Sequence, residues 1–290
     1  MLQVARLAPT QLGESRDLIA AFLHGRIGPD GRFVDRAGNG DLYYTVFGLD
    51  GLIALQEGVP PATRSYLEQF DAIDALDFVH AACLARGWAS IQHRPGAAVA
   101  DALLRRITGC RSADGGFSTA PGAAHGSAYA AFLAVGAHQD LGREIPDAQA
   151  LLGSLRSLRA ADGSFGNHPG VPSGLTTATA AAVLVMRHFE AGPDRDAGIW
   201  LLDRCHERGG FFAAPLAPMP DLLSTATALH ALSALQVPVA GLREACLDFV
   251  DSLWTSRGGF FGSWADDTLD CEYTYYGLLT LGHLTAAAPA

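Results

Sequence analysis

The sequence predicts an all-α protein, an (α/α)6 toroid of six helical hairpin repeats that forms a single domain over residues 1–290. A short Gly-aromatic turn recurs along the chain, and a polar-faced helix precedes each turn while an almost wholly apolar helix follows it. The composition, with 49% hydrophobic and 17% charged residues, is that of a globular protein.

The Gly-aromatic turns define the repeat. Their phenylalanines are separated by 84, 48, 46 and 49 residues, so the first gap has room for one degenerate repeat. A helical stretch at residues 73–84 is expected to belong to it. The five turns lie near residues 30–33, 114–117, 162–165, 208–211 and 257–260.

The two helices of each repeat differ in polarity. The first has one polar face, as in residues 147–159 and 198–208. A helix that is apolar all round is buried on all sides, so the second helices are predicted to form an inner ring around a central cavity, with the first and last repeats as neighbours. The aligned apolar helices begin near residues 41, 173, 221 and 270.

Charge and composition exclude several classes of partner. Thirty acidic residues against twenty basic ones, all of them Arg, give a net charge of −10, which argues against nucleic acid or an anionic membrane as the main partner. The chain has no apolar stretch long enough for a membrane span and no recognisable signal peptide, and its five cysteines are scattered. A cytoplasmic location with reduced thiols is expected.

The repeat resembles a known family. Residues 208–232 carry Gly-Gly-Phe, a Pro-rich loop and Ser-Thr-Ala-x-Ala-Leu, which resembles the repeat of the prenyltransferase and squalene-cyclase superfamily. That superfamily includes β subunits of protein prenyltransferases, toroidal domains of class II terpene cyclases and non-enzymatic relatives. The resemblance implies a toroid that binds an isoprenoid.

The resemblance to protein prenyltransferases implies a zinc site that this chain does not match. Alignment of the apolar helices places the family's Asp, Cys and His ligands on Asp221, Leu223 and Tyr273. One ligand of three cannot hold zinc, so no metal or other cofactor is predicted. Zinc remains an alternative only with a different set of ligands, Cys271, Glu272 and His283.

The resemblance to class II cyclases implies an acid in an Asp-x-Asp-Asp motif whose middle Asp protonates the substrate. Alignment on a Thr-x-x-Ala/Gly-Leu core places the outer aspartates on Asp267 and Asp270 and the middle one on Leu269. The predicted acids are therefore Asp266, Asp267 and Asp270, three carboxyls that would repel one another so that one keeps its proton.

The same positions have a structural interpretation. Asp41, Asp221 and Asp270 each begin an apolar helix, where an Asp accepts backbone N–H bonds as an N-cap. His125 and Ser173 are expected to fill that position in two other repeats.

Aromatic residues of the first and last repeats are predicted to gather on one wall of the cavity, where they would bind an isoprenoid chain and stabilise a cation. The alternative is that they only fill a narrow barrel. The predicted substrate-binding residues are Tyr43, Tyr44, Phe47, His125, Tyr129, Asp221, Trp264, Tyr273 and Tyr276.

These features favour a terpene cyclase-like enzyme that starts cyclisation or isomerisation of a prenyl chain with a proton. Two alternatives stay open: a prenyltransferase β-like chain that needs a helical partner subunit, and a non-catalytic binding or scaffold relative. A homodimer is a further possibility, because the active site of class II cyclases usually lies between two helical domains.

Overall fold

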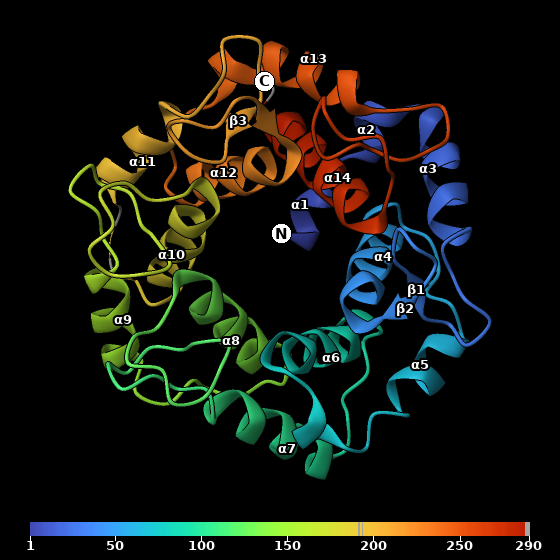
Figure 1. Ribbon diagram of the computed structural model, residues 1–290. Coiled ribbons are helices and arrows are strands. Elements are labelled where there is room, and N and C mark those ends of the chain that lie inside the picture. Colours follow the sequence, from blue (N-terminus) through green and yellow to red (C-terminus); the bar gives the residue numbers. More distant parts are fainter. Residues whose placement is uncertain (191, 193, 288–290) are drawn as a thin grey trace. The chain divides into compact units, whose positions relative to one another are not determined.

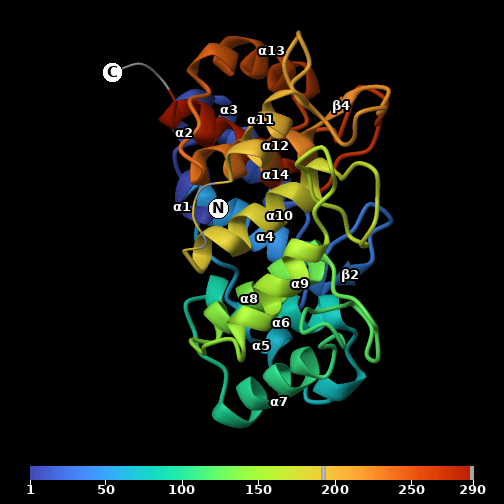
Figure 2. The same cartoon turned by 90° about the vertical axis from the view of Figure 1, so that its left-hand side faces the viewer.

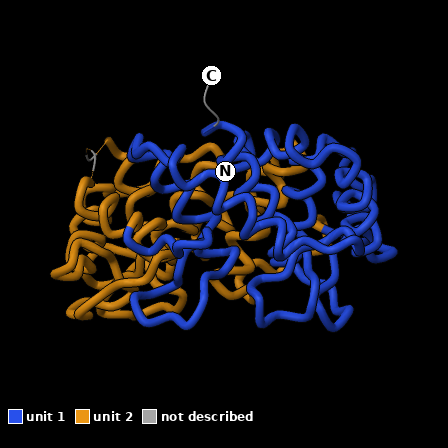
Figure 3. Tube along the Cα trace, turned by 90° about the horizontal axis from the view of Figure 1, so that it is seen from above, with its two compact units in different colours: residues 1–66, 203–290 blue, residues 67–202 orange. Residues whose placement is uncertain are grey.

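The computed structural model describes residues 1–190, 192 and 194–287, and within them nearly all regular structure is helical (Figure 1). By the contacts within the chain, residues 1–66 and 203–290 form one compact unit and residues 67–202 form another (Figure 3). The all-α prediction is confirmed. That residues 1–290 act as a single domain stays a prediction.

Residues 67–202, unit 2, hold three apolar helices packed side by side in the order α6, α8, α10. Polar-faced helices cover them: α7 packs on α6 and α8, α9 on α8, and α11 on α10. The elements of this unit are η1 (Ile73–Ala75), α6 (Phe78–Ser90), α7 (Ala97–Thr108), α8 (Ala128–Asp140), α9 (Ala148–Ser157), α10 (Thr176–His188) and α11 (Arg195–Leu202).

Unit 1 repeats this plan with segments from both ends of the chain. Helix α14 lies between α12 and α4, so the first and last repeats are neighbours as predicted (Figures 1 and 2). Helix α13 packs on α14, and α3 on α4. The elements are α1 (Leu2–Ala5), α2 (Pro9–Leu12), α3 (Ser15–His24), β1 (Phe33–Val34), β2 (Gly40–Asp41), α4 (Leu42–Ala54), α5 (Ala62–Leu67, ending one residue past the unit), β3 (Phe211–Phe212), β4 (Pro220–Asp221), α12 (Leu222–Ala234), η2 (Ala240–Leu242), α13 (Arg243–Leu253) and α14 (Cys271–Ala286).

The Gly-aromatic turns are built alike. In all five, the phenylalanine forms an antiparallel bridge to the residue six positions before it. The five phenylalanines, Phe33, Phe117, Phe165, Phe211 and Phe260, are at most 1% exposed. The repeat predicted from sequence therefore has a physical cause, because each ring fills the space between a turn and its apolar helix.

A threonine of the apolar helix fixes the turn in three repeats. The backbone N–H of Phe33 donates to Thr45 Oγ1 at 3.0 Å, and the equivalent bonds of Phe165 and Phe211 are 2.9 Å long. Gly48 of the same helix has no Cβ, and a Cβ added there would lie 2.0 Å from the Phe33 ring. The Thr and Gly positions of the repeat thus serve to seat the phenylalanine.

Two predicted boundaries are wrong by several residues. The helix expected over residues 73–84 begins only at Phe78, because Asp77 caps it by accepting the N–H of His80 at 2.8 Å. The helix expected over residues 198–208 ends at Leu202, because residues 203–210 form the turn before β3.

Candidate active site

Three aspartates begin the three apolar helices of unit 1, as the sequence predicts. Asp41, Asp221 and Asp270 are the N-caps of α4, α12 and α14, each accepting a backbone N–H three residues on. His125 and Ser173 do not fill this role, and that prediction is wrong. Helix α8 is capped by Ser127, and α10 begins after Leu175 with no side-chain cap.

Arg36, in the loop between β1 and β2, joins two of the predicted acids. Its Nε donates to Asp270 Oδ2 at 2.7 Å, and its two terminal nitrogens donate to the two oxygens of Asp266 at 3.0 and 2.8 Å. Its guanidinium carbon lies 5.3 Å from the centre of the Tyr273 ring. The side chain of Asp270 is only 1% exposed, so Arg36 supplies the charge that this buried carboxylate needs.

Asp266 does not show the raised pKa that repulsion among the three carboxyls would give it. Burial by itself raises the pKa of Asp266, but hydrogen bonds from Arg36 and from the backbone N–H groups of Thr268 and Gly262 outweigh it, and the pKa lies below its usual range. Asp267 is exposed and accepts a hydrogen bond from the Thr268 hydroxyl at 2.9 Å. The expected repulsion is replaced by an ion-paired cluster.

Glu272 is a fourth carboxyl near Arg36 and Asp270, and the acid motif predicted from the sequence did not include it. Glu272, in the first turn of α14, accepts a hydrogen bond from the Tyr43 hydroxyl of α4 at 2.7 Å. Burial raises the pKa of Glu272 to about 7, with a further increase from the charge of Asp270, while Tyr43 and Arg36 act in the opposite direction. Glu272 therefore keeps its proton to a higher pH than an ordinary glutamic acid does.

The position of Asp270 also changes how the acid motif is aligned. If the N-cap Asp270 takes the first place of Asp-x-Asp-Asp, then Glu272 takes the middle place and Tyr273 the last. The glutamate could have been found from the sequence by its spacing of two residues from the capping aspartate.

Aromatic side chains of α4 and α14 meet next to Glu272. The ring of Phe47 lies 5.0 Å from that of Tyr43, 5.9 Å from Tyr275 and 5.4 Å from Tyr276. Tyr44 lies 5.6 Å from Tyr43. The structure thus brings together aromatic residues of the first and last repeats, as the sequence predicts. The five rings of Tyr43, Tyr44, Phe47, Tyr275 and Tyr276 are called the aromatic cluster below.

Three predicted residues, Tyr44, Asp221 and Tyr273, lie at the N-terminal ends of α4, α12 and α14. Burial, with the charges of nearby carboxylates, raises the pKa of Tyr44 and of Tyr273 to about 12, so both remain uncharged phenols. Burial also raises the pKa of Asp221, although it accepts the Ser224 N–H and hydroxyl at 2.7 and 2.8 Å. The charge of Asp221 contributes to the raised pKa of Tyr273.

Three predicted substrate-binding residues lie elsewhere. Trp264 packs against Phe249 of α13, at 5.5 Å between ring centres, and its indole N–H donates to Ser252 at 2.9 Å. His125 and Tyr129 belong to unit 2, where both are exposed; the imidazole of His125 lies 3.6 Å from Asp114, and the backbone N–H of Tyr129 donates to Asn167. Each therefore has a local partner outside the aromatic cluster.

The alternative zinc ligands do not converge. His283 pairs with His230, at 3.0 Å between Nε2 and Nδ1, while Cys271 is fully buried at the other end of α14. Across residues 1–190, 192 and 194–287, no three His, Cys, Asp or Glu side chains are grouped to hold a metal ion.

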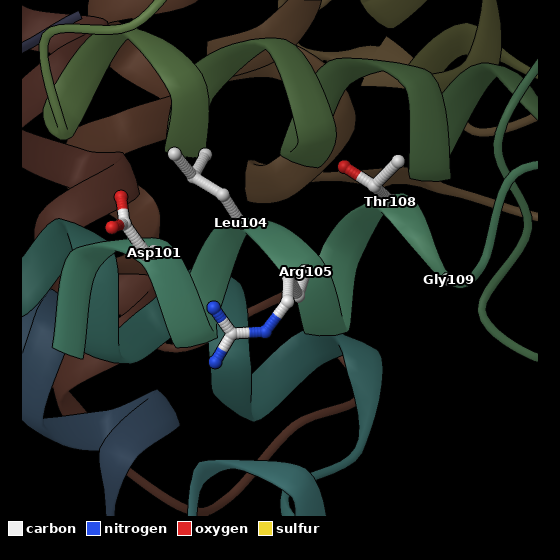
Figure 4. A pocket seen from close by; sticks show the side chains of 5 residues that line it. All are labelled: Asp101, Leu104, Arg105, Thr108 and Gly109. Atoms are coloured by element: carbon white, nitrogen blue, oxygen red, sulfur yellow. The ribbon is translucent and has the colours of Figure 1, made fainter. Parts of the chain in front are cut away.

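A hollow on α7, lined by Asp101, Leu104, Arg105, Thr108 and Gly109, is open to solvent and carries none of the predicted site residues (Figure 4).

The comparisons with known proteins agree with this architecture. The family model of the prenyltransferase alpha-alpha toroid domain matches residues 92–185 and 175–288, which is more than half of the chain. The protein belongs to this family, and the predicted toroid fold class is confirmed. No curated protein matches it in sequence. No helix within the described residues is long and apolar enough to cross a membrane.

Two solved enzymes have a similar fold. The type II terpene cyclase MstE from Scytonema, in its apo form, aligns with a TM-score of 0.69 and 15% identity over 96% of this chain and 98% of its own. A variant of that enzyme was solved with its substrate, geranylgeranyl dihydroxybenzoate. Candida albicans protein geranylgeranyltransferase-I, complexed with GGPP, aligns with a TM-score of 0.69 and 10% identity over 91% of this chain and 89% of its own. At these identities the likeness concerns the fold.

Proposed function

We propose that this protein binds an isoprenoid chain and cyclises or isomerises it after protonating an alkene, with Glu272 as the proton donor. The observation that carries the proposal is the position of Glu272. Its carboxyl is held by Tyr43 beside the aromatic cluster and is flanked by the Arg36–Asp270 ion pair. The similar fold of a type II terpene cyclase, one of whose structures holds a geranylgeranyl substrate, supports an isoprenoid ligand.

The chemistry requires an acid that keeps its proton and still gives it up. An ordinary glutamic acid is ionised at neutral pH, whereas the raised pKa of Glu272 leaves a large protonated fraction. In the first step the O–H bond of Glu272 breaks, and the alkene π electrons form a C–H bond and leave a tertiary carbocation. The nearby rings of Phe47, Tyr275 and Tyr276 would stabilise this cation through their π faces.

The three aspartates named from sequence take different parts in this proposal. Asp270 and Asp266 hold Arg36, and Asp270 adds to the increase that burial gives to the pKa of Glu272. Asp267 is exposed and has no part in proton transfer. Asp267→Asn therefore serves as the matched control for Glu272→Gln.

Product analysis tests the proposal. Purified wild type, Glu272→Gln, Asp270→Asn and Asp267→Asn are incubated with farnesyl and geranylgeranyl compounds carrying diphosphate, alcohol or aryl ester ends. Wild type and Asp267→Asn should give cyclic or isomerised products, and Glu272→Gln should lose at least a hundredfold in rate. An active Glu272→Gln variant would refute the acid assignment, and an inactive wild type would refute the proposed chemistry.

A further inference from the structure

A pair of histidines, which the proposed acid step does not use, lies on α12 and α14 of unit 1. His230 of α12 and His283 of α14 contact each other at 3.0 Å between Nδ1 and Nε2, with ring centres 5.1 Å apart. His283 is 4% exposed and His230 is partly exposed.

His283 and the acid Glu272 lie on one side of α14. Eleven residues separate Glu272 from His283, which is close to three full turns, so the two side chains leave the helix about 20° apart in direction. They are separated by about 16 Å along the helix axis. Tyr276, four residues after Glu272, lies on the same side and contacts Phe47. Glu272, Tyr276 and His283 therefore follow one another along one side of α14.

We infer that the His230–His283 pair is the base that ends the proposed reaction, with His230 accepting the proton and His283 as its positioning residue. This inference rests on the proposed function. A cyclisation started by a proton must end by losing one, and an isoprenoid extended along this side of α14 carries the cation from the acid end to the opposite end. The separation of about 16 Å corresponds to several isoprene units, so the pair selects farnesyl or longer chains over geranyl ones.

The step balances without another reactant. In the tautomer in which Nδ1 of His230 donates to Nε2 of His283, Nε2 of His230 keeps its lone pair. A C–H bond next to the cation breaks, its electron pair forms a C=C bond, and the proton binds to that nitrogen. Product and substrate then have the same formula. The imidazolium afterwards loses its proton to water, and the Glu272 carboxylate regains one.

The surroundings of the two groups favour these opposite roles. Burial, the positive charge of the chain's amino terminus and, for His230, the neighbouring His283 lower the pKa of His230 to about 3 and that of His283 to about 4. The pair is thus neutral when Glu272, facing Tyr43, Asp270 and Arg36, still carries its proton. Even a weak base suffices, because a C–H bond beside a carbocation is very strongly acidic. Acid and base are therefore both ready in the same pH range.

The product spectrum tests this inference. His230→Phe removes the base at similar volume, His230→Gln keeps a hydrogen-bonding side chain, and His24→Ala replaces an exposed histidine as the control. With a farnesyl or geranylgeranyl substrate, both His230 variants should still consume substrate. The wild-type alkene should fall at least tenfold, in favour of alcohols from water capture or alkenes with a shifted double bond. His24→Ala should match wild type.

The outcomes separate the two proposals. If wild type converts no substrate, the proposed function fails and the inference with it. If wild type is active and either His230 variant gives the wild-type products in the wild-type ratio, only the inference is overturned. Loss of all substrate consumption by both His230 variants, with thermal midpoints equal to that of wild type, would also overturn it, because the base acts after the cation has formed.

Discussion

Glu272→Gln should make the folded protein more stable at alkaline pH while removing its activity. The pKa of Glu272 is about 7 in the folded chain and 4.5 in an ordinary environment. A carboxyl whose pKa rises on folding stabilises the folded state at pH values below its pKa in the unfolded chain. This stabilisation is lost as the pH rises through its pKa in the folded chain. The difference corresponds to about 3 kcal/mol in full, of which about 2 kcal/mol develops between about pH 5 and about pH 8.

Urea denaturation of wild type and Glu272→Gln at a series of pH values measures this effect. The free energy of unfolding of wild type, relative to that of the variant, should fall by about 2 kcal/mol across that range, since glutamine can still accept the Tyr43 hydroxyl but does not titrate. Glu207→Gln, at an exposed glutamate, should show no such trend. A difference between wild type and Glu272→Gln that is independent of pH would refute the account of this carboxyl.

Three other predictions concern the same scaffold. Arg36→Met leaves Asp270 buried without its counter-charge and should cost about 2 to 3 kcal/mol in urea denaturation, whereas Asp267→Asn should cost less than about 0.5 kcal/mol. Gly48→Ala, whose new Cβ would overlap the Phe33 ring, should lower stability by about 2 kcal/mol, while Gly136→Ala, in open space on α8, should raise it by up to about 1 kcal/mol in the same assay. Tyr43→Phe removes a hydrogen bond that lowers the pKa of Glu272, so the decline of activity with rising pH should move to higher pH; an unmoved profile would contradict the contact.

Much of the fold follows from local patterns because the repeat encodes its own packing. Each Gly-aromatic turn has a buried ring, three of the five turns bond to a threonine of the apolar helix, and both features are visible in the sequence around Phe165 and Thr179. The adjacency of α4 and α14 follows from closing the ring of repeats. The exact starts of α6 and α8 could not be predicted from the sequence. Asp77 and Ser127 cap these helices at positions that the alignment of repeats did not indicate.

The site was predicted less well than the fold because its chemistry depends on contacts between distant segments. Asp266 and Asp270 were predicted as acids because they belong to a local acidic run. In the structure both carboxyls are paired with Arg36, which is more than two hundred residues away in the chain. The raised pKa of Glu272 likewise depends on burial beside Tyr43 of another helix. Trp264 was expected with the tyrosines, but its loop turns toward α13, where Phe249 and Ser252 bind the indole.

The source of the first proton can be traced with deuterium. Wild-type protein is incubated in D2O with a geranylgeranyl substrate, and the product is examined by mass spectrometry and NMR. Protonation by Glu272, whose carboxyl exchanges with solvent, predicts one deuterium in the product, at the carbon that was the protonated end of the alkene. A rearranged product without deuterium would contradict the account, because the cation would then have formed by loss of a leaving group.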